Sequence, residues 1–432
     1  MDLFRSLKAG NWPLLFGIVF FTGMMAVGYY YNLTFVQFGL LDLGTRVIGM
    51  SEQRVATAMA VLAVITSIVA ITFGLYMMRR GWSEQFKMKL RLAFGVVLIQ
   101  TALTWIAPDV RSEAGFLTWV VIAAIAMGIG VPVTFGMTVD LVPVRYRGHA
   151  GALITAGAYF PAAVLSATRT IEQFSAGLIW VMLAGMLSLG ALAFADLDFV
   201  SRLARQHRHA EFGRGRFVRI GTEGKPKVRR SLILLVILMF GIFFIDSLGF
   251  LRLAETPFFF ETAWQSPELT PRLNIGITHV LAALIAGVLY AALNEKELFL
   301  WIFGIFGLVH LMYSGMARNF PIGEPTLAAP ILYSIAVSLY TVVNFAIWAD
   351  VSTPRTISRD TAVGVAMSGF TATFLSTALA LQLRLAGVSL ETHLRIVDAL
   401  AMLFFLMVFI LIFFAPVARR RNKDRESVKE RG

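Results

Sequence analysis

The 432-residue sequence contains no cysteine, which excludes a disulfide scaffold, a thiolate metal site and thiol catalysis. It also has few charges. Asp, Glu, Lys and Arg make up 15% of the residues, whereas a soluble domain carries roughly 25%. A chain of this length with so few charges cannot cover itself with the usual water-exposed surface. Because 57% of its residues are hydrophobic, we expect lipid to be the solvent for much of it.

Twelve apolar stretches are long enough to cross a bilayer, which takes a helix of roughly 20 residues. They cover residues 12–38, 54–78, 90–108, 116–140, 148–169, 176–196, 231–253, 272–293, 297–317, 326–349, 361–383 and 396–417. Backbone polar groups must be satisfied internally in lipid, so each stretch is expected to be a helix. The first continues well past the length of a signal-peptide core and lacks a cleavage site behind it, which indicates a membrane span.

The positive charges are distributed unevenly between the loops. The net charge of +12 would suggest a nucleic-acid partner in a soluble protein. If the termini and the even-numbered loops lie on one side, however, 29 of the 38 Lys and Arg residues fall on that side. Cytoplasmic loops carry such an excess. We therefore predict a multi-pass protein of the bacterial inner membrane with both termini cytoplasmic and with no nucleic-acid partner.

One long polar stretch, residues 197–230, divides the predicted spans into six plus six. Ten of the basic residues lie in it, and such segments are attracted to anionic headgroups. We predict a first six-helix half over residues 1–196, a basic cytoplasmic linker over 197–230, a second half over 231–417 and a basic cytoplasmic tail over 418–432.

The two halves share a sequence pattern at the ends of spans four and ten. Phe135 precedes Asp140 by the same distance at which Phe345 precedes Asp350. Each aspartate is followed by a nearby proline and then by arginine. The fold class is therefore predicted to be an all-α membrane protein whose twelve or so transmembrane helices form two pseudo-symmetric halves.

This organisation resembles the major facilitator superfamily, whose signature G-x-x-x-D-R-x-G-R-R/K lies between spans two and three. Residues 74–83 read GLYMMRRGWS, in which Gly74, Arg79 and Gly81 match the signature. Methionine replaces its aspartate, and Trp-Ser replaces its last basic pair. The resemblance covers the whole chain by architecture and implies the family's fold and a secondary transporter.

The exit of span four is also similar to that family, especially to sugar porters, which carry an acid, a proline and Arg-Gly at this spacing. Here the stretch from Asp140 to Arg147 and the following glycine fits. An ion pair at the cytoplasmic mouth can favour one of the two packings between which a transporter rocks. We expect Asp140 to pair with Arg79 or Arg147. In the second half, we expect Asp350 to pair with Arg355 or Arg359. Alternatively, these charges only fix the topology.

Asp246, in span seven, is the best candidate for a functional charge inside the membrane. An ionisable residue there is costly and usually functional. With Arg252 and Glu255 it is expected to form a charged cluster that lines a cavity near the outer side, where its carboxylate can carry a coupling proton. The alternative is a structural Asp–Arg pair.

Polar residues also gather in spans one and ten. Tyr31 and Asn32 are adjacent late in span one, and Tyr340 and Asn344 lie one turn apart on one face of span ten. The corresponding helices line the family's central cavity, so the resemblance implies substrate contact. Helix packing is an equally good interpretation.

No constellation in the sequence points to catalysis or to a bound cofactor. His279 and His310 lie alone in apolar stretches without metal-ligand spacing, and we expect each to hydrogen-bond a neighbouring helix. The sequence has no nucleotide-binding loop. The leading prediction is a non-enzymatic secondary active transporter or facilitator for a small organic solute, with proton or sodium coupling in the active case. The alternative is a transporter-shaped assembly or scaffold protein that handles pigments, lipids or membrane-protein partners.

Overall fold

The structure is a computed structural model that describes residues 12–165, 170–213, 215–218, 229–254, 256, 259, 266–318 and 327–413. Twelve helices in these ranges are long and apolar enough to cross a membrane, which confirms the predicted number. The chain is a multi-pass membrane protein. No β-strand occurs in the described ranges.

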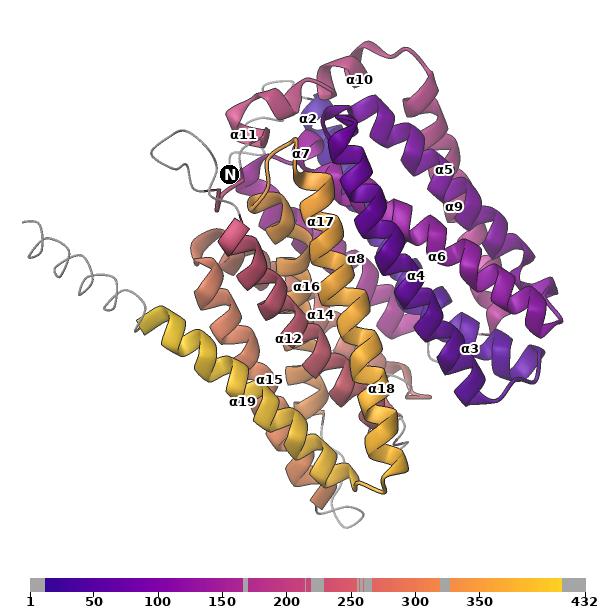
Figure 1. Ribbon diagram of the computed structural model, residues 1–432, viewed down its shortest axis with the longest axis vertical. Coiled ribbons are helices and arrows are strands. Elements are labelled where there is room, and N and C mark those ends of the chain that lie inside the picture. The colour runs from indigo at the N-terminus through magenta and orange to yellow at the C-terminus, as the bar shows by residue number, and fades with distance from the viewer. Residues whose placement is uncertain are drawn as a thin grey trace, which may run out of the picture.

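The first six spans form one helical bundle (Figure 1). They are α2 (Trp12–Tyr31) with its extension to Val47, α4 (Glu52–Arg79), α5 (Phe86–Ile106), α6 (Glu113–Gly136) with α7 (Thr138–Leu141), α8 (Arg147–Leu165) and α9 (Ile171–Phe194). Short connections limit how far successive helices can separate, so neighbours in sequence run antiparallel.

The last six spans form a second bundle. They are α12 (Arg229–Ala254), α14 (Leu269–Ala292), α15 (Glu295–Arg318), α16 (Ala328–Asp350), α17 (Ile357–Val365) with α18 (Ala372–Leu385), and α19 (Leu390–Phe413). The most apolar stretch of α16 is 83% buried and that of α19 only 17%, so α16 is central and α19 faces outward.

The first span is longer than predicted. It runs from Trp12 to Val47 instead of ending at residue 38, and π-helical turns over Asn32–Gly39 and Leu43–Val47 continue it. Arg46 closes an ion pair of 2.7 Å with Asp42 one turn earlier and reaches Glu172 of α9 at 2.6 Å. These contacts stabilise a polar helix end that hydropathy alone does not recognise.

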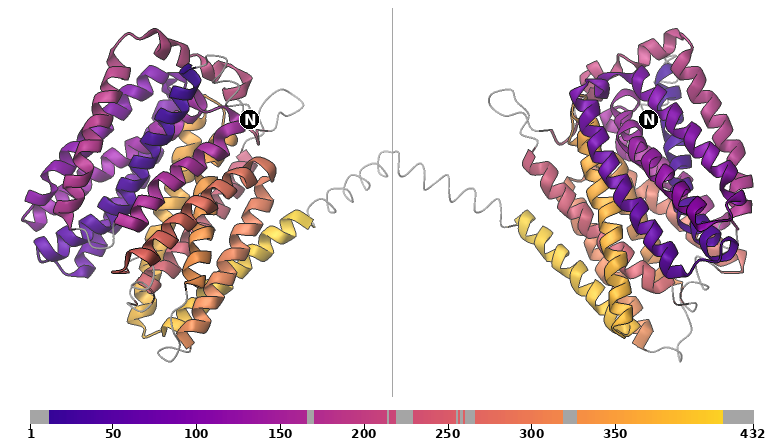
Figure 2. Two further views of the ribbon diagram at one scale, coloured as in Figure 1. Left: turned by 180° about the vertical axis from the view of Figure 1, so that it is seen from behind. Right: turned by 45° about the vertical axis from the view of Figure 1, so that its right-hand side comes forward.

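Several helix pairs join the bundles, among them α8 with α14 and α4 with α17. Glycines permit the close approach. A Cβ on Gly74 of α4 would lie 2.6 Å from the Ser358 carbonyl oxygen of α17, and one on Gly148 of α8 would lie 2.8 Å from the Gly287 carbonyl oxygen of α14. The two bundles lean apart toward the end opposite α10 (Asp198–Leu203) and α11 (Ala210–Gly213), as Figures 1 and 2 show.

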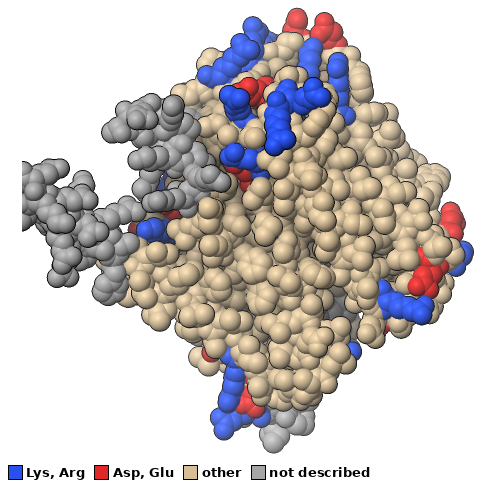
Figure 3. All heavy atoms as spheres, viewed as in Figure 1, with Lys and Arg blue, Asp and Glu red and all other residues tan. Residues whose placement is uncertain are grey.

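Charge is confined to the two ends of the molecule on the face seen in Figure 3, where a band without charged residues separates them. Such a band is what the hydrocarbon core requires. The end that carries α10 and α11 bears most of the basic residues on this face and is called the linker end below.

Candidate functional site

A buried ion pair lies at the linker end of the first bundle. Lys89 Nζ of α5 contacts Asp140 Oδ2 of α7, and both side chains are fully buried. The ammonium also donates to the carbonyl oxygens of Ser83, at 2.8 Å, and Gly136, at 3.0 Å. His207 Nδ1 lies 3.2 Å from Asp140 Oδ1. A compact lysine ammonium suits this convergent set of acceptors.

The expected pairing of Asp140 with Arg79 or Arg147 is therefore wrong. Arg79 is exposed at the last residue of α4 and forms no ion pair within the described ranges. Arg147 points instead toward the second bundle. Lys89 occupies the position expected of an arginine because it lies on α5, directly beside the end of span four.

Arg147 makes the ion pair that joins the two bundles. Its Nη1 lies 2.7 Å from Asp350 Oδ1 at the end of α16, and both side chains are fully buried. Arg147 also donates to the carbonyl oxygens of Ala349, at 2.9 Å, and Phe212, at 2.5 Å. Tyr290 Oη donates to Asp350 Oδ2 at 2.8 Å. The two charges are thus matched across the interface and are held by further hydrogen bonds, as a buried pair requires.

The expected partners of Asp350 in its own half are also wrong. Arg359 pairs with the adjacent Asp360 at 2.6 Å. Arg355 is exposed and has no ion pair in the described part of the chain. The helix α16 ends with Asp350 facing α8 and α14, so residues of the following turn are on the wrong side of it.

The segment after α11 packs into this end of the protein. Phe217 N donates to the Asp350 carbonyl oxygen at 2.8 Å. The Arg216 guanidinium donates to the carbonyl oxygen of Leu293 at 2.7 Å and to that of Tyr290. Contact with lipid headgroups was expected for this basic stretch. In the structure Arg216 and Phe217 bind backbone carbonyls of the second bundle, and the Phe212 carbonyl oxygen accepts from Arg147 of the first.

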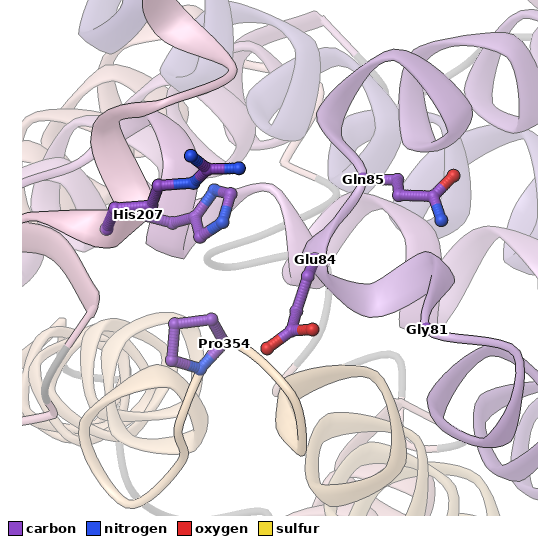
Figure 4. Close-up of a pocket in the computed structure, with 6 residues that line it drawn as sticks. Gly81, Glu84, Gln85, His207 and Pro354 are labelled. Carbon is purple, nitrogen blue, oxygen red and sulfur yellow. The ribbon is translucent and has the colours of Figure 1, made fainter.

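A pocket of about 560 Å³ opens beside these contacts (Figure 4). Its lining comes from the loop after α4, from the linker and from the loop after α16. Those residues are Gly81, Glu84, Gln85, His207, Arg208 and Pro354. Gly81 has φ of 71° and ends α4 in the left-handed region that glycine favours. The two predicted signature glycines thus have separate roles, one at a helix end and Gly74 at the contact with α17.

A second group of polar residues surrounds Asp246, which is half-buried on α12. Tyr340 Oη donates to its Oδ2 at 2.6 Å, and Tyr333 Oη donates to its Oδ1. Asp246 and Arg252 form no ion pair within the described ranges, because Arg252 lies six residues on and faces another side of the helix. Arg252 Nη2 lies 3.4 Å from the Val388 carbonyl oxygen. Glu255 lies outside the described residues.

The first bundle contributes two tyrosines to this group. Tyr159 Oη of α8 lies 3.1 Å from Tyr29 Oη of α2 and 3.5 Å from Thr341 Oγ1 of α16. The Tyr159 ring stacks on His279 of α14, with centroids 4.6 Å apart. His279 Nδ1 lies 2.9 Å from Ser338 Oγ of α16, the interhelical bond expected of a lone histidine. Hydroxyls of both bundles therefore meet near Asp246.

Of the four polar residues singled out in spans one and ten, Tyr340 alone contacts Asp246. Tyr31 stacks on Phe35, with centroids 5.0 Å apart, inside the first bundle. Asn344 Oδ1 accepts a bond of 2.9 Å from Trp348 within α16. Asn32 begins the π-helical part of span one.

The sequence reasoning missed Lys89, Tyr159 and Tyr333, whereas Tyr29 belongs to the same polar run late in span one as Tyr31 and Asn32. One signal could have identified Tyr333, which precedes Tyr340 by seven residues. Residues seven apart share a helix face. The others offer no such signal, because their partners are on distant helices.

Comparisons with known proteins were made for the whole chain. No family model matches the sequence, and no curated protein matches it. Among solved structures, the fold is similar to that of XylE, a proton:xylose symporter of the major facilitator superfamily solved with 6-bromo-6-deoxy-D-glucose. The similarity has a TM-score of 0.62 at 15% sequence identity and covers 93% of this chain and 96% of the other. The chain therefore has the major-facilitator fold that the sequence predicted.

Proposed function

We propose that this protein is a secondary transporter that moves a small organic solute across the bacterial inner membrane by alternating access. The observation that carries the proposal is the fully buried Arg147–Asp350 pair, which closes the linker end by joining the two bundles. A contact of this kind must break when the bundles rock apart. The basic residues at this end favour a cytoplasmic location for it and for both termini.

The gate in this proposal consists of Arg147, Asp350 and Tyr290, with the segment around Phe217 bound over them. The Lys89–Asp140 pair shapes the first bundle's side of the gate. Arg79, Arg355 and Arg359 are not part of it.

The solute site in this proposal is the group of hydroxyls around Asp246. Tyr29 and Tyr159 come from the first bundle, and Tyr333 and Tyr340 from the second. Hydroxyl groups contributed from both sides suit a small polar solute, and the structural neighbour was solved with a halogenated deoxyglucose. Asp246 is the only carboxylate in the group among the described residues and is proposed to carry the coupling proton.

Replacing Asp246 by asparagine tests this proposal. We expect solute-driven proton movement to fall at least tenfold, because an amide keeps the shape but cannot take up a proton. Solute exchange without a gradient should persist. The measurement uses proteoliposomes that contain pyranine and a panel of small solutes beginning with D-xylose.

Asp198→Asn is the matched control, because Asp198 lies exposed on α10, far from the proposed site. It should behave like the native chain. Full proton coupling in Asp246→Asn would contradict the coupling role. Absence of flux for every solute, together with a stable co-purifying pigment or membrane partner, would contradict transport itself.

Replacing Gly148 by valine should weaken closure of the linker end. Its side chain would meet the Gly287 carbonyl oxygen and Tyr290 within about 3 Å, so the closed packing should lose about 1–3 kcal/mol. Spin labels at Arg80→Cys and Ala292→Cys, on exposed sites of opposite bundles, report the separation in this cysteine-free chain. We expect Gly148→Val to show a larger share of long distances between the two labels than the native chain does.

Gly95→Val is the control for that substitution, since a Cβ on Gly95 meets nothing within 4 Å. Its label distances should match those of the native chain. Unchanged distances in Gly148→Val would mean that the α8–α14 contact does not set the conformational balance.

A further inference from the structure

His310 of α15 is a fully buried histidine that the proposed solute site does not use. Its Nδ1 lies 2.8 Å from the Phe306 carbonyl oxygen. A carbonyl can only accept, so Nδ1 carries the hydrogen and Nε2 carries a lone pair. Nε2 has no hydrogen-bond partner among the described residues. A buried acceptor left unpaired is costly, which calls for a functional explanation.

The unpaired nitrogen faces α12, where a glycine leaves room for it. A Cβ added to Gly249 would clash with the His310 ring, whose Nε2 is the nearest atom. The preceding residue, Leu248, accepts a bond of 2.9 Å from His393 Nε2 of α19. The two imidazoles therefore lie over consecutive residues of α12. His393 is near the start of α19, at the end opposite the linker.

Helix α19 also brings a carboxylate close to α15. Asp398 Oδ1 of α19 is buried and has no hydrogen-bond partner in the described ranges. It lies 3.8 Å from the position of a Cβ on Gly307, one turn before His310.

His310 also contacts a residue that is hydrogen-bonded to Asp246. The rings of His310 and Tyr333 meet edge to face, with centroids 5.9 Å apart. Tyr333 Oη donates to Asp246 Oδ1. Tyr313 of α15 packs on the same Tyr333 ring, with centroids 6.3 Å apart. The titratable groups around His310 are therefore Tyr313 on its own helix, Tyr333 on α16, His393 and Asp398 on α19, and Asp246 on α12.

We propose that His310 is a proton relay that loads Asp246 from the end opposite the linker, through the second bundle instead of through the solute path. The inference rests on the proposed function. A proton that enters past His393 binds at His310 Nε2 and forms an imidazolium. The imidazolium ring then turns toward Tyr333, whose ring it already contacts, and gives a proton to Tyr333 Oη as the tyrosine gives its own to Asp246 Oδ1. The imidazole returns to neutral, the carboxylate becomes a carboxylic acid and the tyrosine is unchanged.

A separate proton path has a functional consequence. Asp246 can be protonated while a solute occupies the space between the bundles, because the relay residues lie on α12, α15, α16 and α19 of one bundle. The proton and the solute can then bind in either order, because neither blocks the path of the other.

The test measures how fast Asp246 becomes protonated and needs no solute. Protein in vesicles of phosphatidylethanolamine and phosphatidylglycerol receives a rapid pH drop, and infrared absorption follows the carboxylic acid band that Asp246→Asn removes. We expect His310→Gln to slow the appearance of this band at least tenfold, toward the roughly hundredfold effect of a positioned proton-transfer group. The final amplitude should equal that of the native chain.

Rescue and a matched control distinguish a relay from damage to packing. Imidazole added to His310→Ala should restore much of the rate. His149→Gln, at an exposed histidine of α8, should leave the rate unchanged. A native rate in His310→Gln, or a slow rate that imidazole does not change in His310→Ala, would overturn the relay. Absence of flux in the native chain would instead count against transport, whatever the rate of protonation.

Discussion

Replacing Arg147 by alanine should open the linker end of the protein. The substitution leaves the fully buried Asp350 carboxylate with two donors among the described residues, the Tyr290 hydroxyl and the backbone N–H of Arg216. Breaking a buried ion pair by removing one partner costs about 3–5 kcal/mol. The cost applies to the closed state, because the carboxylate is hydrated once the bundles separate. A bias of this size shifts a two-state equilibrium by roughly a hundredfold or more.

The measurement is the distance between labels at Arg80→Cys and Ala292→Cys, which should move almost wholly to long values. Arg147→Lys should give an intermediate result, since lysine keeps the charge but cannot donate in the fork that reaches Asp350, Ala349 and Phe212. Adding Asp350→Asn to Arg147→Ala should restore part of the closed population, because no charge is then left buried. A native distance distribution in Arg147→Ala would show that the pair is not the gate.

The spans, the six-plus-six organisation and the charged residues at the bundle ends could be predicted from the sequence, because hydropathy and spacing are local properties of the chain. The partners of those charges could not. Asp140 was expected to pair with Arg79 or Arg147, yet Lys89 of α5 reaches it. Which faces of two helices meet depends on their rotation about their own axes, and no single sequence reports that rotation.

The linker shows a second limit of sequence reasoning. Its composition predicts a basic linker at anionic headgroups, and does not indicate that Phe217 N binds the Asp350 carbonyl oxygen. Backbone hydrogen bonds are the same for every residue type except proline, so they leave no trace in composition. Asp246 was identified because a carboxylate in an apolar helix is conspicuous, whereas its tyrosine partners are common membrane residues.

Replacing Lys89 by methionine should destabilise the fold without opening the linker end. Lys89 and Asp140 are both fully buried, like Arg147 and Asp350, so the expected cost of removing one partner is again about 3–5 kcal/mol. The difference lies in where the partners sit. Lys89, Asp140 and the two carbonyls that accept from Lys89 all belong to the first bundle. A rocking motion of whole bundles leaves this pair intact, so both conformations lose the same stabilisation.

Thermal unfolding in detergent and the same label distances separate the two effects. Lys89→Met should lower the unfolding temperature and keep the native label distances. Arg147→Ala should instead change the label distances and leave the unfolding temperature near that of the native chain. Lys89→Met combined with Asp140→Asn should regain stability, because a neutral pair of similar volume leaves no unpaired charge. A shift of Lys89→Met to long distances would mean that Asp140 exchanges partners during the motion, and His207, 3.2 Å from Asp140 Oδ1, would then be the residue through which the linker takes part in it.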